Sequence, residues 1–414
     1  MRTGFFIALT ACGFHPGAAT SDDAIGGDSA PPIASCSDHV KDGDETNVDC
    51  GGSCAACSTC TVHALPPTIN VDPKPFAAKF LSAPQWSCTS TGITTIDSDA
   101  GTVVSTTCDL GSISVANGVP QLDSTGVPVF VVRLQGLRVT NGHVLRVIGD
   151  KPVVILVAGD VIVDTNGMID ASAAGATPGP GGSPLSCANR ETGLGTMGTN
   201  TGWGGGGGGF GTAGGQGCYM TINGGAVTGS QNLVPLRGGC PGGTSQSAGQ
   251  GGAGGGAIEI AASGRIKIGE TGIANIAASG GGGRNSDGGG NGGGAGGGIL
   301  LVAPANPMLG TMGALRTNGG SGTGGASAVG TSSNDGGDGH TADNNAATDT
   351  SGTGGGGNGN DNGRTGGLAN RNGNGGLKTA AGNTTGQQNG GRGGGGGGGG
   401  RIVVTTSPAA TSCD

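Results

Sequence analysis

Residues 153–173 read VVILVAGDVIVDTNGMIDASA, and this stretch sets the pattern for the second half of the chain. A short apolar run, a break and a second apolar run are followed by a polar turn, a glycine and a third short run. The same order recurs in residues 257–279 and 299–319, and partial copies stand at 129–148 and 401–406. A unit that recurs in this way indicates one structural motif used several times.

Alternation within the copies indicates strands with one buried face. Ile258 and Ile260 fall on one side and Glu259 on the other, a period of two residues. Because three short strands cannot bury a face alone, the copies predict an all-β fold, namely a parallel β-helix or solenoid-like domain with long Gly-rich loops. The aligned glycines are expected at positive φ in small turns, and they are Gly167, Gly272 and Gly313.

Three Gly-rich excursions interrupt the copies, at residues 176–256, 280–298 and 319–400. Glycine makes up 100 of the 414 residues. One interpretation is low-complexity disorder or long loops, because glycine loses the most backbone entropy on ordering. The other is a set of packed extended glycine helices whose backbones hydrogen-bond directly. The sequence leaves both open.

Composition excludes several functional classes. Aromatic residues are 2% of the chain, too few for the packed core of an ordinary α/β enzyme. The net charge of −8, without a basic stripe, argues against a nucleic-acid partner. No histidine stands near a nucleophile motif. Asp160 and Glu259 could lie on adjacent coils, as the paired carboxylates of β-helix polysaccharide enzymes do. The favoured interpretation is that both are ordinary outward-facing polar residues on strands, so no catalytic residue is assigned.

The N-terminus indicates export. Residues 1–11 combine Arg2, a short apolar stretch and small residues, as in a signal peptide. The sequence Leu-Thr-Ala-Cys at residues 9–12 resembles the bacterial lipobox, which implies cleavage before Cys12 and acylation of its sulfur. Gly13 then implies the outer membrane of the cell envelope, on its surface or periplasmic side. A plain secretory signal is the alternative.

The rest of the chain divides by composition. Residues 12–35 are expected to be a flexible spacer, residues 36–60 a Cys-rich disulfide module and residues 61–128 a β-rich entry segment with a hairpin. Residues 129–414 form the Gly-rich repeat domain.

Twelve cysteines suit an oxidising compartment. If Cys12 carries lipid, eleven remain, so one is unpaired or intermolecular, or the lipid assignment is wrong. Cys88 and Cys108 flank a symmetric hairpin turn at residues 97–101 and are predicted to pair. The full set of disulfide candidates is Cys36, Cys50, Cys54, Cys57, Cys60, Cys88, Cys108, Cys187, Cys218, Cys240 and Cys413.

One acidic loop has calcium-like spacing. Asp38, Asp42, Gly43 and Asp49 take positions 1, 5, 6 and 12 of an EF-hand-type loop, although position 3 is Val40. An acidic turn clamped by disulfides is the competing and favoured interpretation. The Cys-x-x-Cys spacings nearby suit zinc in a reducing compartment but disulfides behind an export signal. No other cofactor is expected.

Two resemblances accompany these residues. The module CSDHVKDGDETNVDCGGSCAAC at residues 36–57 is similar to a short Cys-rich repeat of exported proteins of myxobacterial type. Residues 129–406 resemble glycine-rich, PGRS-like surface proteins, a looser match carried by residues 142–164 and 236–243. These resemblances imply location and architecture, and no mechanism.

Two functions follow as hypotheses. The first is a non-enzymatic envelope lipoprotein, anchored in the membrane through lipid, with a structural or adhesive role towards extracellular matrix or polysaccharide. The second is a polysaccharide-binding or polysaccharide-degrading protein. Clustered carboxylates and aromatic side chains along a groove would favour the second.

The lipobox resemblance predicts that the mature chain begins at an acylated Cys12. Mass spectrometry of the mature N-terminus should detect this modified cysteine, and a Cys12→Ala variant should lose it. An intact Met1, or cleavage at another position, would show that the lipid assignment is wrong.

Overall fold

The computed structural model describes residues 36, 43, 52–54, 62–80, 82–184, 187, 204–217, 222–245, 249–284, 289–323, 338–339, 394–407 and 410–413. The chain forms two compact units, Met1–Cys60 and Thr61–Asp414. In the first unit a disulfide joins Cys36 to Cys54, with their Cα atoms 5.5 Å apart. The account below concerns the second unit.

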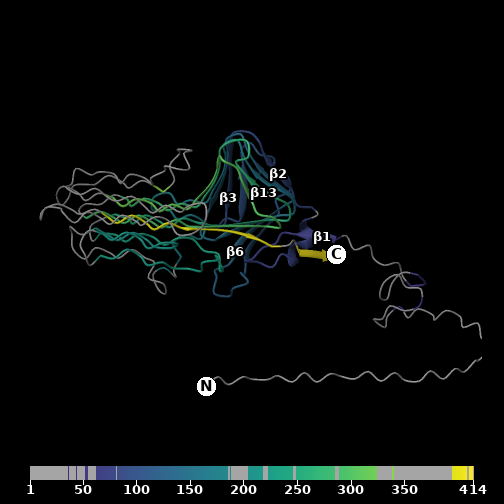
Figure 1. Cartoon of the computed structure of the whole chain (residues 1–414), viewed down its shortest axis with the longest axis horizontal. Helices are drawn as coiled ribbons and strands as arrows, with labels where there is room; N and C mark the ends of the chain where they lie inside the picture. Colours follow the sequence, from purple (N-terminus) through teal and green to yellow (C-terminus); the bar gives the residue numbers. More distant parts are fainter. Residues whose placement is uncertain are drawn as a thin grey trace, which may run out of the picture. The chain divides into compact units, whose positions relative to one another are not determined.

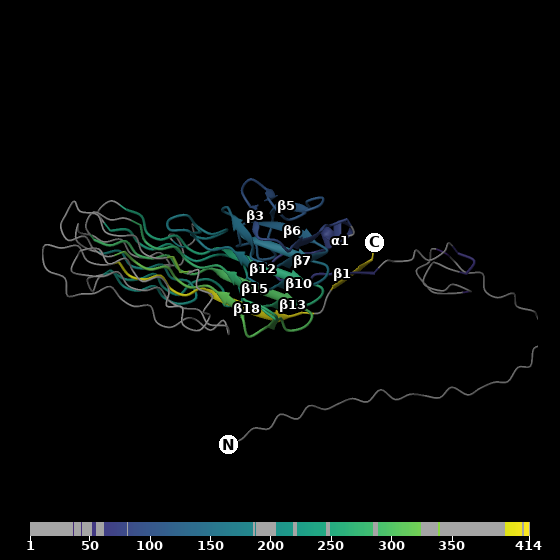
Figure 2. The same ribbon diagram turned by 90° about the horizontal axis from the view of Figure 1, so that it is seen from above.

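Three large sheets form the body of the second unit (Figures 1 and 2). Sheet 1 contains β16 (Met308–Leu309), β13 (Ile266–Ile268), β10 (Val161–Val163), β7 (Gly136–Val139) and β2 (Gln85–Cys88), in that order. Sheet 2 contains β17 (Gly313–Arg316), β14 (Ala274–Ala277), β11 (Gly167–Asp170), β8 (His143–Ile148), β3 (Gly92–Asp97) and β4 (Thr102–Ser105). Sheet 3 contains β18 (Arg401–Thr406), β15 (Gly298–Ala303), β12 (Ala257–Ala262), β9 (Val153–Val157), β6 (Val129–Leu134) and β5 (Val115–Val119).

Sheet 1 is entirely parallel, and sheets 2 and 3 are mixed. Most neighbouring strands are parallel, whereas β4 and β5 pair antiparallel with β3 and β6. A separate antiparallel pair joins β1 (Val62–Leu65) to β19 (Ala410–Cys413). Helix is almost absent from the described residues: a 3-10 turn η1 (Lys74–Phe76) leads into the one-turn helix α1 (Ala77–Phe80). Parallel strands with crossover connections are usual in α/β sheets, but the described parts of these connections contain almost no helix.

The predicted parallel β-helix or solenoid-like domain with long Gly-rich loops is therefore wrong. In a solenoid each repeat contacts only its neighbours. Here the body consists of one parallel sheet and two mixed sheets that each have one antiparallel edge strand, and the described parts of the Gly-rich excursions are packed segments that bond across long sequence distances. The repeat correctly predicts strands, but the pattern of these strands carries no information about what the glycines between them contact.

The aligned glycines also have a different role from the one expected. None of Gly167, Gly272 and Gly313 has a positive φ. A Cβ atom at Gly167 would overlap the carbonyl oxygen of Val139, and one at Gly313 would overlap that of Ile268. These positions require glycine because another backbone passes too close for a side chain.

Two apolar clusters stabilise the body. The larger lies between the sheets and contains inward-facing residues such as Trp86, Phe130 and Ile155, all fully buried. The smaller covers the outer face of sheet 3, where Phe76 and Phe80 of the η1–α1 segment pack together with Leu236. Full burial of such side chains stabilises by about 1.5–3 kcal/mol each.

Glycine-rich segments extend from the sheets side by side (Figures 1 and 2). We call them the glycine bundle; it comprises residues 204–217, 222–228, 238–243, 251–256, 278–284, 289–297, 317–323 and 394–400. Most of these residues are buried, although they are assigned to neither helix nor strand. The described excursions are thus packed extended chains, the second of the two interpretations.

Hydrogen bonds in the glycine bundle repeat every three residues. Along residues 292–297, amides that are three residues apart donate to the same neighbouring segment. Residues 292 and 295 donate to segment 240–243, residues 293 and 296 to segment 395–398, and residues 294 and 297 to segment 278–281. The carbonyl groups of residues 292–294 accept from three further segments, at Gly252, Gly208 and Gly320. A period of three is that of an extended helix without internal hydrogen bonds, so an inner chain such as residues 292–297 bonds to others all around its axis.

This packing explains where glycine is required. A Cβ at Gly207 would overlap the carbonyl oxygen of Gly396, and one at Gly297 would overlap that of Gly256. On the outside of the bundle every third residue carries a side chain: Ala213 and Gln216 on one segment, Asn223 and Ala226 on another, are exposed. An inner chain faces neighbours on every side, whereas an outer chain has one side free for a small side chain.

The inner positions predict a large effect of one methyl group. Gly297→Ala should lower the free energy of unfolding by about 3 kcal/mol or more, because neighbouring backbone cannot yield to the added carbon. Gly136→Ala is the matched control, since its Cβ would meet the flexible Gln85 side chain at 3.3 Å. Chemical denaturation measures both, and equal small effects would contradict the close packing.

Candidate functional site

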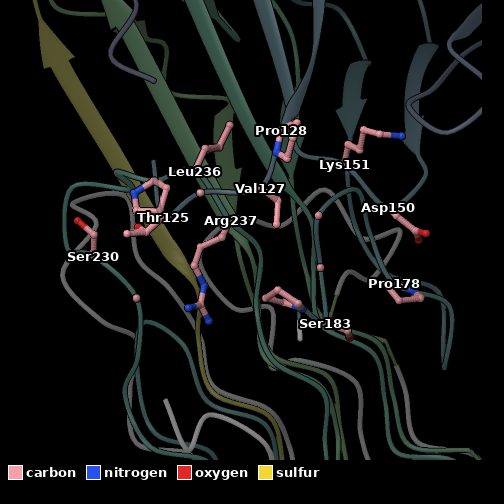
Figure 3. A pocket seen from close by; sticks show the side chains of 16 residues that line it. Thr125, Val127, Pro128, Asp150, Lys151, Pro178, Ser183, Ser230, Leu236 and Arg237 are labelled. Carbon is pink, nitrogen blue, oxygen red and sulfur yellow. The ribbon is translucent and has the colours of Figure 1, made fainter. Parts of the chain in front are cut away.

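A pocket of about 570 Å³ lies at the ends of β6 and β9 where these strands begin (Figure 3). Residues 125–128 and 150–151, which precede the two strands, form one part of its wall. Residues 178–184 and the segments 229–230 and 235–237, which connect to the glycine bundle, form the rest. The volume lies in the range of small-molecule sites.

Rigid residues shape this pocket. Pro128, Pro178, Pro184 and Pro235 line it, and each fixes its own φ angle. The buried Gln121 side chain holds two walls together: its Nε2 donates to the carbonyl oxygens of Val127 (2.8 Å) and Leu236 (3.0 Å), and its Oε1 accepts from the Leu236 amide (2.7 Å). The walls are therefore in place without a ligand.

Buried cations stand beside one wall. The Nη2 atom of Arg237 lies 3.6 Å from the sulfur of Cys187 and 3.5 Å from that of Cys240, which are joined as a disulfide. The guanidinium groups of Arg237 and Arg401 each lie 5.5 Å from the centre of the Phe210 ring, a cation–π arrangement. Burial, and secondarily repulsion from Arg401, lower the pKa of Arg237 to about 10, so it stays charged at neutral pH.

The remaining polar lining groups are mostly engaged. The hydroxyl oxygen of Ser183 accepts from the Gly254 amide at 2.9 Å, and that of Ser230 accepts from the Asn232 amide at 3.3 Å. The ammonium of Lys151 donates to the carbonyl oxygen of Ser98 at 3.2 Å. Asp150 is the one carboxylate among the lining residues, and carboxylate-based glycoside hydrolysis uses two.

Three disulfides join cysteines that the structure describes: Cys36–Cys54, Cys88–Cys108 and Cys187–Cys240. The Cys88–Cys108 bond is the one that the hairpin symmetry predicts, and it flanks the β3–β4 hairpin. Of the other candidates, Cys413 lies in β19, whereas Cys12, Cys50, Cys57, Cys60 and Cys218 lie outside the described residues.

The calcium candidates Asp38, Asp42 and Asp49 also lie outside the described residues, and calcium stays a prediction. Within the part that is described, no group of three His, Cys, Asp or Glu residues is placed to hold a metal ion. Among the same residues, no helix has the length and apolar character needed to cross a membrane.

The structure does not bring Asp160 and Glu259 together as a catalytic pair. Asp160 precedes β10 of sheet 1 and accepts from the Arg265 amide at 2.7 Å. Glu259 lies in β12 of sheet 3. Its carboxylate is fully buried beneath residues 68–70 and has a structural role.

Glu259 is the anchor for the segment that covers sheet 3. One carboxylate oxygen accepts from the Thr68 hydroxyl (2.7 Å) and the Ile69 amide (2.9 Å), and the other from the backbone and side-chain amides of Asn70 (3.3 and 3.0 Å). Burial raises the pKa of Glu259, and it outweighs the lowering effect of these four hydrogen bonds. The alternating pattern placed Glu259 outward, but it gave no sign of the covering segment.

His143 is a second buried polar group. It is fully buried in β8, with Nε2 2.9 Å from the Thr94 hydroxyl and Nδ1 2.9 Å from the Ser90 carbonyl oxygen. Both ring nitrogens have partners, so this histidine stabilises the contact between β3 and β8 and is not available to a ligand.

Comparison with known proteins finds no matching family, no matching curated protein and no matching solved structure. Functional inference therefore rests on the geometry described above.

Glu259 predicts a distinctive pH dependence. The pKa of Glu259 in the folded state is raised above its value in the unfolded state. At pH values between these two pKa values the folded chain binds more protons than the unfolded chain, so the free energy of unfolding falls as the pH rises through this range. In Glu259→Gln this component should vanish. The variant should also lose about 1–3 kcal/mol, since the side-chain NH2 group of Gln, which replaces one carboxylate oxygen, cannot accept from the donors that bonded to that oxygen.

Denaturation of both proteins between acidic and neutral pH measures this effect. Glu270→Gln is the matched control, because Glu270 is partly exposed and pairs with Lys267 at 3.0 Å on the surface. An unchanged pH profile in Glu259→Gln would contradict the anchoring role.

Proposed function

We propose that this protein is a non-enzymatic component of the bacterial cell envelope, with a structural or adhesive role. The observation that supports it most strongly is the glycine bundle. Its order derives from backbone hydrogen bonds between neighbouring chains, in three directions around an inner chain such as residues 292–297, so it provides a firm extension without any arrangement of reactive side chains. Such an element suits display and repeated weak contact, in which affinity grows with the number of copies.

The sequence also supports a cellular location for this architecture. The lipobox-like residues at Cys12 and the spacer at residues 12–35 would attach the chain to the outer membrane. The spacer is rich in Gly, Ala, Ser, Asp and Pro, as in flexible linkers. The second unit would then stand away from the lipid surface.

The engaged polar groups of the described residues support a non-catalytic role. Glu259 and His143 bond within the fold. Burial acts to raise the pKa of Asp164, at the turn after β10, but the hydrogen bonds that it accepts from the Thr271 hydroxyl and from the amides of Thr165, Thr271 and Gly272 outweigh this effect and lower it. Groups that bond to their own backbone stabilise the fold and leave few side chains to act on a substrate.

A second function, polysaccharide binding, is favoured by the pocket. Its volume and its walls of proline, Val127 and Leu236, with Asp150 and Arg237 also in the lining, suit a short saccharide. Binding there is compatible with adhesion, since the same contact repeated over many anchored copies holds a polymer.

Adhesion is tested on intact cells. Cells that display the protein should attach to polysaccharide-coated surfaces, and Cys12→Ala should release the protein and abolish attachment. Attachment that is unchanged without the protein would contradict the proposal, and depolymerisation of the coating by purified protein would establish an enzyme.

The pocket has its own test. Val127→Arg should abolish oligosaccharide binding in calorimetry with a panel of acidic and neutral sugars, because Val127 lines the pocket and is 49% exposed. Leu122→Arg is the control: it is 61% exposed on the same loop and lies outside the lining. Equal affinities for both variants would exclude the pocket while leaving the structural role intact.

A further inference from the structure

Each large sheet ends on its most C-terminal strand: β16, β17 or β18. At the opposite end, β4 and β5 form antiparallel edges of sheets 2 and 3, and β5 contains an irregularity between Ala116 and Val119. Sheet 1 ends there on β2, which is parallel to β7. Natural proteins protect sheet edges with such bulges and short strands. The three C-terminal edge strands have no antiparallel partner and no irregularity of this kind among the described residues.

The edge at β18 is the longest of the three unprotected ones. β18 has six residues, all of them paired with β15 on one side. Within the described residues no strand pairs with its other side. Val404 is 39% exposed, and the strand contains no proline, lysine or acidic residue. An unpaired edge strand of six residues, with an exposed valine and no protecting residue, is a template for a further strand.

The charge of β18 favours pairing with itself. Its one charged residue is Arg401, and that side chain is buried, donating to the carbonyl oxygens of Phe210, Thr228 and Gly229. The exposed part of the strand is thus neutral. Like charges would not oppose one another if two copies met there.

We propose that β18 is a homodimer interface, in which two copies of this chain pair antiparallel through this edge. A register centred on Val404 places this valine opposite its symmetry copy, places Val403 opposite Thr405, and leaves both Arg401 residues at the ends. Cross-strand pairs of β-branched side chains stabilise such ladders. Because the arrangement has two-fold symmetry and uses one edge per copy, it closes at two copies.

Sedimentation velocity of the full-length protein over a concentration series tests the interface. The wild type should show a monomer–dimer equilibrium. Val404→Lys should weaken dimerisation about tenfold or more, because it places two cations near the dyad. Val104→Lys is the matched control: Val104 is 61% exposed on β4, at the protected end, and this variant should dimerise as the wild type does.

Hydrogen exchange on the wild type keeps the test decisive if Val404→Lys does not fold. Amides of residues 402–406 should exchange more slowly as the protein concentration rises, whereas those of β4 should not change. A monomer at every concentration, or equal loss of dimer in the two lysine variants, would overturn the proposal. Neither outcome bears on the adhesive role.

Discussion

Direct hydrogen bonding between backbones without side chains is the constraint on which the second unit depends. Glycine loses more conformational entropy on folding than any other residue, and a bundle of glycine chains gains little from apolar burial. That cost is offset because amides of one chain find carbonyl groups on several neighbours, as residues 292–297 do. The three sheets hold the ends of these chains in register, and the clusters between and outside the sheets supply the apolar stabilisation.

The strands and one disulfide could be predicted from the sequence, because their signals are local. Alternating residues such as Ile258 and Glu259 indicate a strand, and the symmetry of Cys88 and Cys108 about a turn indicates a hairpin. The arrangement of the sheets was predicted wrongly. A glycine tract has no apolar periodicity, so nothing in residues 292–297 indicates that their partners are near residues 240, 280 and 396.

The pocket and the Glu259 anchor could not be predicted from the sequence for the same reason. Gln121 joins walls whose segments, around Val127 and Leu236, lie far apart in sequence. Glu259 meets Thr68 and Asn70 nearly two hundred positions earlier. Contacts of this kind depend on the assembled sheets, and residue type alone predicted only that these side chains are polar.

The central claim, that glycine order comes from bonds between chains, is tested most directly by amide hydrogen exchange resolved to single residues. The account predicts that inner amides, such as those of residues 292–297, exchange as slowly as those of β9 and β12, because all open only when the fold opens. Exchange at the rate of an unstructured peptide, in a protein whose strands remain protected, would contradict the account.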